Sequence, residues 1–228
     1  MNIDELFEAG AHIGYAKTRR HPEMRTYVFG ARNNVEIFDL SKTLAKIKEA
    51  EEFIKKTGEE GKTILWVGTK PSAKKHIEEA GVKTGAPYVV GRWLGGTLTN
   101  FKVLESRLSY WARLEDEETS GEFEKYSKKE KLIKRRELEK LARMFGGLRN
   151  LKTTPGVLII VDSGEERTAL AEAFKKSIPV VALLNVDCDP KGIDYPIPMN
   201  DNSSAAISLV LVSLAAAYET GKKVRQSV

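Results

Sequence analysis

The chain is poor in cysteine, with Cys188 as its single thiol in 228 residues. One thiol cannot form an intramolecular disulfide, and it cannot build a cysteine cage around a metal ion. The sequence therefore favours a reducing, cytoplasmic setting. We name no metal ligand and no cofactor from the sequence.

Long apolar runs are missing as well. The longest, AAISLVLVSLAAA at 205–217, has 13 residues and contains two serines. This run is too short to cross a bilayer, so it predicts a buried core helix. The N-terminal stretch MNIDELFEAGAHIGY has no basic region followed by an apolar core, and it predicts no signal peptide. Neither stretch predicts a membrane partner.

Motifs for catalysis and nucleotide binding are incomplete. The three histidines have no HxxxH spacing, and GxSxG is absent. GEEGKT at 58–63 precedes a predicted strand, whereas a phosphate-binding loop must follow one. In GRWLGG at 91–96, Trp93 stands where a dinucleotide loop needs its second glycine. The sequence therefore predicts no enzyme and no small-molecule substrate.

Asp162 keeps one alternative open. It ends a predicted strand, where a receiver domain has its phospho-acceptor, and Thr69 and Lys70 follow another strand. Receiver domains also need an acidic pair that holds a metal, and none follows the first strand. We favour the interpretation that Asp162 caps the next helix. An enzyme or signalling module centred on Asp162 is the competing hypothesis.

Short β-branched runs alternate with helical patterns along most of the chain. Continuous apolar runs of this kind are typical of strands buried on both faces of a parallel sheet. The predicted strands are 63–67, 87–90, 156–162 and 179–186, and the predicted helices are 41–56, 71–81, 163–177 and about 203–219. Ser41 and Ser163 are the expected helix caps. The alternation predicts a doubly wound α/β domain.

Residues 101–148 interrupt this alternation because they contain no strand pattern. Apolar residues recur at 3-4-3 spacing in two stretches, at Phe101, Leu104, Leu108 and Trp111, and at Leu138, Leu141, Phe145 and Leu148. Two narrow stripes predict an antiparallel coiled-coil hairpin that protrudes from an α/β domain formed by 1–100 and 149–228. Leu132 and Ile133 fall off the stripe, which suggests an apolar patch for a neighbouring protein.

The charge is unevenly distributed. The chain carries +5, while 125–147 contains nine Lys or Arg and three Glu, a local charge of +6. A second basic segment, 17–32, has five cations against Glu23 in loop-like sequence. Such clusters predict a polyanionic partner, most commonly nucleic acid. A helical-hairpin adaptor that binds proteins without RNA is a further alternative.

Several side chains are candidates for phosphate or base contacts. Arg92 and Trp93 lie beside a Gly-Gly pair, where the indole could stack on a base, or pack beneath the hairpin's root instead. Lys74 opens the helix after the first buried strand. The remaining candidates are Lys17, Arg19, Arg20, Arg25 and Arg32 in the basic segment, and Lys128, Lys134, Arg135 and Arg136 on the expected solvent side of the hairpin.

Specific strings reveal a family resemblance. FGARNNVEIFDLSKT and RWLGGTLTN are similar to the bacterial ribosomal protein S2 family, and the match runs from about residue 4 to 221. The resemblance implies a flavodoxin-like domain with a projecting coiled-coil hairpin, and it implies no enzymatic activity. It also implies a binder of small-subunit ribosomal RNA that bridges head and body, lies near other small-subunit proteins and helps recruit ribosomal protein S1.

The resemblance also assigns residues. It implies that RNA faces Arg19, Arg25, Arg32, Lys70, Lys74, Arg92, Trp93 and the hairpin cations. One departure concerns the family pattern HxGH, because Tyr15 stands here where the second histidine is common. A metal bridged by that histidine is therefore not expected.

Overall fold

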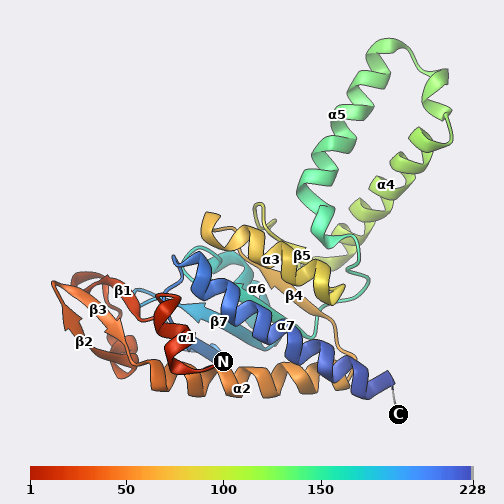
Figure 1. Ribbon diagram of the computed structural model, residues 1–228. Coiled ribbons are helices and arrows are strands. Elements are labelled where there is room, and N and C mark those ends of the chain that lie inside the picture. The colour runs from red at the N-terminus through yellow and green to blue at the C-terminus, as the bar shows by residue number, and fades with distance from the viewer. Residues whose placement is uncertain (227–228) are drawn as a thin grey trace.

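A five-stranded parallel sheet forms the centre of the molecule, and residues 1–226 are described by the computed structural model (Figure 1). Its strand order is β5-β4-β6-β7-β8, with all neighbours parallel. The strands are β4 (Ile64–Val67), β5 (Tyr88–Val89), β6 (Val157–Val161), β7 (Val180–Leu184) and β8 (Tyr195–Pro198). Four of them confirm the predicted strands. β8 was not predicted, because Pro196 and Pro198 obscure its pattern and are tolerated only at a sheet edge.

Helices cover both faces of this sheet, so every residue of β6 and β7 is buried. Alternate strand residues belong to two separate apolar clusters. One face packs against α1 (Ile3–Glu8), α2 (Leu40–Glu59), α3 (Pro71–Thr84) and α7 (Ser204–Gln226). The other face packs against α6 (Arg167–Lys175), the root of the helical hairpin and part of the N-terminal sheet.

Helix α7 contains the longest apolar run of the sequence. Its 23 residues are long and apolar enough to cross a membrane by length and composition alone. Ile207, Val210 and Leu214 are nonetheless fully buried against the sheet and its neighbouring helices. α7 and α2 lie side by side, and at Gly221 the α7 backbone directly faces the Lys55 carbonyl of α2. The prediction of a buried core helix is confirmed.

The helix starts differ from two predicted caps. Helix α2 is capped by Asp39, whose Oδ1 accepts from the Ser41 N–H at 3.1 Å, so Ser41 is not the cap. Helix α6 begins at Arg167 rather than near Ser163, because Asp162 first organises a tight turn. Helix α3 continues past the predicted end at 81 and stops at Gly85, whose left-handed φ of 65° suits glycine.

A three-stranded antiparallel sheet precedes the parallel one. It contains β1 (Ile13–Ala16), β2 (Val28–Arg32) and β3 (Val35–Phe38), in the order β1-β3-β2. Asn33 and Asn34, both with positive φ, form the tight connection between β2 and β3. Two short 3₁₀ turns, Lys17–Arg19 and Pro22–Tyr27, lie before β2. The loop-like description of 17–32 was therefore wrong for 28–32, which form β2, while 17–27 contain only these short turns and their connections.

Helices α4 (Phe101–Thr119) and α5 (Lys128–Phe145) form an antiparallel hairpin that projects from the body of the molecule (Figure 1). Trp111, Leu138, Leu141 and Phe145 are buried along the seam, as their spacing predicted. A capping box between Ser127 and Glu130 fixes the start of α5. Leu132 and Ile133, at 50% and 54% exposure, lie outside the seam.

Candidate nucleic-acid interface

The five cations of the N-terminal basic segment divide into two groups. Arg19 Nη2 lies 2.6 Å from Asp187 Oδ2, and its guanidinium stacks over the Tyr15 ring at 4.1 Å. Arg20 Nη1 lies 2.8 Å from Glu36 Oε1, and Glu36 is itself buried. The other three, Lys17, Arg25 and Arg32, are exposed and make no ion pair within residues 1–226. These three are the cations of the segment that remain available to an anion.

The hairpin cations divide in the same way. Lys134 Nζ bonds Glu117 Oε2 of α4 at 2.7 Å and lies 4.0 Å from the Tyr126 ring centroid. Arg135 Nε lies 3.2 Å from Glu118 Oε1. Lys134 was predicted on the solvent side of the apolar stripe, and its side chain is half-buried against α4, where Glu117 holds it. Lys128 and Arg136 are exposed without an acidic partner among the described residues.

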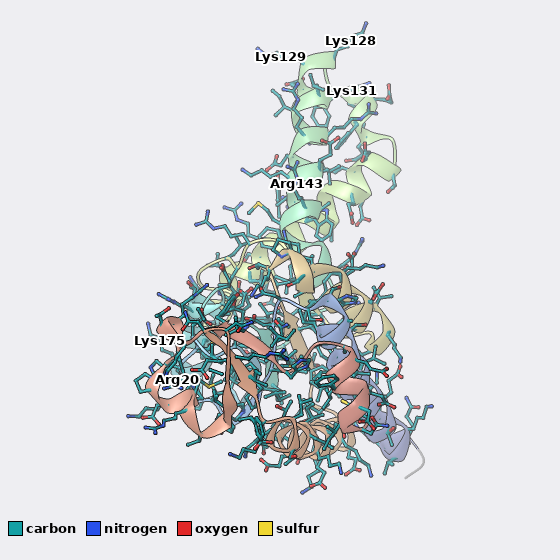
Figure 2. The ribbon with its side chains drawn as sticks, turned by 60° about the vertical axis from the view of Figure 1, so that its left-hand side comes forward. Arg20, Lys128, Lys129, Lys131, Arg143 and Lys175 are labelled. Atoms are coloured by element: carbon teal, nitrogen blue, oxygen red, sulfur yellow. The ribbon has the colours of Figure 1, made fainter. Side chains whose placement is uncertain are left out.

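Acids on α4 offset much of the hairpin's positive charge. Across 101–148 there are 12 Lys or Arg and 10 Asp or Glu, so the whole hairpin is only weakly basic. The excess lies on the outward face of α5, where Lys129, Arg136, Lys140 and Arg143 recur at helical spacing and are all exposed. Figure 2 shows Lys128 and Lys129 at the tip of the hairpin and Arg143 nearer its root. The cationic surface is therefore one-sided.

The loop 91–100 places its two predicted contact residues differently. Trp93 is only 8% exposed, and its Nε1 donates to Glu172 Oε1 at 3.1 Å. Its ring belongs to the same buried cluster as Leu104 and Phe145, so it packs beneath the hairpin's root. The prediction that this indole faces RNA was wrong. Arg92 is exposed and borders a polar hollow of about 470 Å³.

One carboxylate holds this loop in place. Glu172 of α6 is 6% exposed, and it accepts five hydrogen bonds of 2.8–3.1 Å. The donors are Trp93 Nε1 and the Gly96 N–H at Oε1, and the Leu98 N–H, Thr99 N–H and Thr99 hydroxyl at Oε2. Burial would raise the pKa of Glu172, but these donors lower it below its ordinary value.

Sequence reasoning missed Glu172. A glutamate in a charged helix normally faces solvent, and no motif marks this one. Its position held a usable signal, because Glu172 follows Ala169 by three residues and precedes Ala173, and both alanines face the core. An acid on the apolar stripe of a helix must find buried donors.

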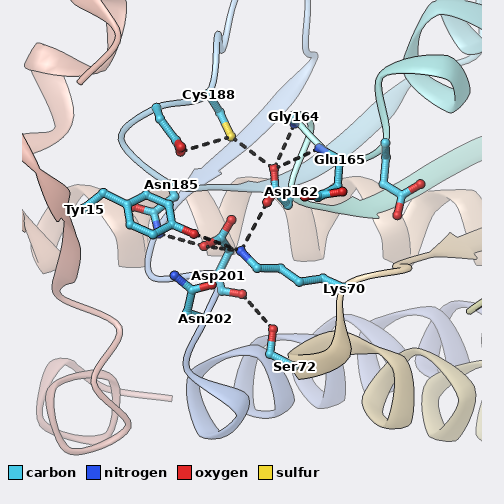
Figure 3. Close-up of polar contacts among 12 residues, drawn as sticks. Tyr15, Lys70, Ser72, Asp162, Gly164, Glu165, Asn185, Cys188, Asp201 and Asn202 are labelled. Atoms are coloured by element: carbon cyan, nitrogen blue, oxygen red, sulfur yellow. Dashed lines mark hydrogen bonds and ion pairs between the residues drawn. The ribbon is translucent and has the colours of Figure 1, made fainter. Parts of the chain in front are cut away.

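A second buried polar cluster lies at the carboxyl edge of the parallel sheet (Figure 3). Lys70 Nζ lies 3.0 Å from Asp201 Oδ1 and 3.2 Å from Asp162 Oδ2, and it donates to the Tyr15 hydroxyl at 3.2 Å. Burial would lower the pKa of Lys70, but the two carboxylates raise it overall. Lys70 is therefore committed to internal partners, and the expectation that it faces RNA was wrong.

The same cluster accounts for Asp162. This residue has a positive φ of 69°, and its Oδ1 accepts from the N–H groups of Gly164 and Glu165 at 2.9 and 3.2 Å. It thus caps the turn that precedes α6, whereas Glu166 occupies the N-cap position of the helix, so the interpretation that Asp162 caps the helix itself was wrong. Asp201 is fully buried, with Oδ1 accepting from Asn185 Nδ2 at 2.7 Å, and burial raises its pKa to about 6.

Comparison with known proteins identifies the family. A family model described as ribosomal protein S2 matches residues 6–221. The chain belongs to the ribosomal protein S2 family. Similar curated proteins are named small ribosomal subunit protein uS2. One from Dictyoglomus thermophilum is 46% identical over 98% of this chain and 91% of its own length. One from Roseiflexus sp. is 45% identical over 100% of this chain and 87% of its own length. One from Nitratiruptor sp. is 42% identical over 99% of this chain and 85% of its own length.

The S2 family is structural and non-enzymatic, which confirms the prediction that this chain is not an enzyme. The geometry agrees, because the carboxylates of Asp162 and Asp201 are both held by Lys70. Burial also raises the pKa of the Cys188 thiol to about 11, which leaves it unreactive near neutrality. The hypothesis of an enzyme or signalling module centred on Asp162 is therefore set aside.

The residues at the HxGH position of the S2 family do not fit a metal here. The Tyr15 hydroxyl accepts from the Lys70 ammonium, which would repel a cation at that place. The His12 ring is stacked on Phe7, with 4.2 Å between ring centroids. Within residues 1–226, no group of three or more His, Cys, Asp or Glu side chains is arranged to hold a metal ion.

Proposed function

We propose that this protein is a structural, cytoplasmic component of the small ribosomal subunit and that it binds ribosomal RNA. The observation that carries the proposal is the S2 family match over residues 6–221. Relatives that are 42–46% identical over nearly the whole chain bear the name of a small ribosomal subunit protein. The binding residues below are assigned from their exposure and charge.

The proposed contacts are cations that have no internal partner. Phosphate contacts come mainly from Lys and Arg side chains, and a cation already held by a carboxylate contributes less. The first set is Lys17, Arg25, Arg32, Lys74, Arg92, Lys128 and Arg136, each exposed and without an ion pair within the described residues. Arg19, Arg20, Lys134 and Arg135 form a second set, whose internal ion pairs must be shared with the RNA.

We propose a flavodoxin-like α/β domain with an inserted coiled-coil hairpin. Counted within the parallel sheet alone, the strand order is 2-1-3-4-5, the order of flavodoxin-like doubly wound sheets. We propose that residues 1–100 and 149–226 form this α/β unit and that 101–148 form the inserted hairpin, while residues 227 and 228 of the predicted domain lie outside the described residues. The seam of Leu138, Leu141 and Phe145 against Trp111 supports a short coiled coil.

Two separated cationic surfaces suit a protein that joins two parts of an RNA. The N-terminal sheet and the hairpin lie at opposite ends of the molecule (Figure 1). We propose that this arrangement bridges the head and body of the small subunit. Leu132 and Ile133, exposed beside the cationic stripe of α5, are the proposed contacts for a neighbouring ribosomal protein. Recruitment of ribosomal protein S1 is part of the same proposal.

Sedimentation of cell lysate tests the proposal. The tagged protein should co-migrate with small subunits, whereas a free protein stays at the top of the gradient. The variant Arg25→Glu/Arg32→Glu/Lys128→Glu/Arg136→Glu should move to the top while keeping its circular dichroism spectrum. The matched control is Lys48→Glu/Lys56→Glu, because these α2 side chains are exposed and make no ion pair within residues 1–226.

Two results would count against RNA anchoring. One is that the variant sediments with subunits as well as the wild type does. The other is that nuclease digestion of the RNA leaves the protein bound to the same partners, as expected for a protein adaptor. If the tagged wild type is absent from small subunits, the proposed function itself is wrong.

A further inference from the structure

Phe29 is an unusually exposed aromatic residue. It lies in β2, an edge strand of the three-stranded sheet, and its side chain is 80% exposed. Burying a phenyl ring in the core would stabilise the fold, so a ring left in water on a regular strand calls for another explanation. The three tryptophans, by contrast, are all buried, including the one that the sequence suggested for base stacking.

The backbone at Phe29 departs from a regular strand. Val28 of β2 pairs with Phe38 of β3, and Gly30 pairs with Ile37, so the register shifts by two residues in β2 for one residue in β3. Phe29 is therefore the extra residue of a β-bulge. A bulge takes a residue out of the ladder and redirects its side chain, and bulges are common next to functional sites. Gly30 follows, and a Cβ there would meet nothing within 4 Å. The surface beside the ring is thus open.

The charges around the ring indicate the kind of ligand. Phe29 borders a hollow of about 270 Å³ that Lys17, Arg25 and the Arg20–Glu36 ion pair also line. Arg32 lies at the end of the same strand. Among the described residues, the only acid lining this hollow is Glu36, whose charge Arg20 balances. The surface therefore combines a bare aromatic face with unpaired cations, a combination that suits a base and its phosphates.

We propose that Phe29 is the stacking platform for an unpaired nucleobase, and that Lys17, Arg25 and Arg32 hold the flanking phosphates. The ligand class is single-stranded RNA, because a base inside a duplex cannot offer its face to a ring at the surface. This inference rests on the proposed RNA-binding function and specifies one of its sites. An apolar protein partner would fit the ring but would leave the three cations unpaired.

The first experiment compares two labelled RNA probes of about ten nucleotides with the full chain. One probe is a single strand with bases, and the other has the same phosphates but abasic positions throughout its centre. Phe29→Ala should lose roughly 5- to 150-fold in affinity for the probe with bases, which corresponds to a stacking contribution of about 1–3 kcal/mol. Its affinity for the abasic probe should stay within about twofold. Phe29→Tyr should bind both probes as the wild type does.

Phe7→Ala is the matched control. Phe7 is also an exposed aromatic, but it lies among the acidic residues Asp4, Glu5 and Glu8 of α1. Its removal should leave both affinities unchanged. Phe29→Trp gives a direct measurement, because the fluorescence of its exposed indole should be quenched when the probe with bases binds. The native tryptophans are buried and contribute a separate, blue-shifted emission.

The outcomes separate this inference from the proposed function. If Phe29→Ala binds the probe with bases as tightly as the wild type does, stacking at Phe29 is wrong, while sedimentation with subunits still supports RNA binding. If Phe29→Ala leaves RNA affinity intact but abolishes association with small subunits, the ring docks on a protein and the inference is overturned. Equal losses for both probes would also overturn it, because the ring would then act through the phosphates or the fold.

Discussion

Glu172→Gln is the sharpest test of how the loop 91–100 is organised. The wild-type carboxylate accepts at both oxygens, two bonds at Oε1 and three at Oε2. A glutamine has one acceptor oxygen, and its NH₂ group must then face donors. If the amide oxygen takes the three bonds from Leu98 and Thr99, the NH₂ group faces the N–H groups of Trp93 and Gly96. Two buried hydrogen bonds are lost, and two donors are left unsatisfied.

The expected cost follows from these two bonds. A hydrogen bond to a charged group contributes about 1.5–3 kcal/mol net, and a neutral side chain at this buried site is easier to desolvate. The lower end of that range gives a loss of about 3 kcal/mol in the free energy of unfolding at neutral pH. Because the loop leads directly into α4, amide hydrogen exchange should also quicken at Gly96, Leu98 and Thr99.

The stabilisation that Glu172 provides depends on pH in a definite direction. The pKa of Glu172 is lowered in the folded state, so its stabilisation is fully present above the unfolded value of about 4.3. This stabilisation is lost as the pH falls through the folded pKa. The difference between wild type and Glu172→Gln should therefore be largest at neutral pH and shrink below about pH 4.

Urea unfolding followed by tryptophan fluorescence and near-ultraviolet circular dichroism measures this difference. The control is Glu165→Gln, which changes an exposed carboxylate just before α6. The reasoning fails if Glu172→Gln is destabilised no more than this control. It also fails if the difference between the two glutamine variants does not depend on pH.

Three further predictions concern other parts of the molecule. Because burial raises the pKa of Asp201 to about 6, the folded state binds one more proton than the unfolded state between about pH 4 and 6. The free energy of unfolding should therefore fall as the pH rises through this range, by at most about 3 kcal/mol. Asp201→Asn should remove this trend in urea unfolding. Gly221→Ala should cost about 1–3 kcal/mol in thermal unfolding because its Cβ would collide with the Lys55 carbonyl, whereas Gly146→Ala, with open space around it, should not. If the seven unpaired cations each contact a phosphate, RNA affinity should fall roughly 10³-fold between about 50 and 200 mM salt, and a weak dependence would contradict that contact set.

Local patterns predicted most of the α/β core and the hairpin. The strands at 63–67 and 156–162 were recognisable because a strand buried on both faces is apolar at every position. The hairpin seam was recognisable because its apolar residues follow helical spacing. β8 and the N-terminal sheet were missed because prolines, glycines and charges mask their short alternation.

The candidate interface was predictable in location but not in detail. A basic segment can be recognised from composition, whereas the state of each cation depends on partners contributed by the fold. Arg19 pairs with Asp187, which lies 168 positions away in the sequence, and Lys70 pairs with Asp162, which lies 92 positions away. The buried Trp93 Nε1 has its acceptor on Glu172 of α6, 79 positions away in the sequence. The spacing of residues along the sequence does not predict these pairings.

The two buried carboxylate systems face inward, yet each supports one of the surfaces proposed to bind RNA. Lys70, Asp162 and Asp201 fasten Tyr15, and with it the N-terminal sheet, to the carboxyl edge of the parallel sheet. Glu172 fastens the loop from which the hairpin begins. A protein that contacts RNA at two ends gains affinity when both ends are held in fixed relation beforehand, because less entropy is lost on binding. Lys70 and Glu172 are therefore positioning residues, and their loss should weaken RNA binding without changing the number of phosphates contacted.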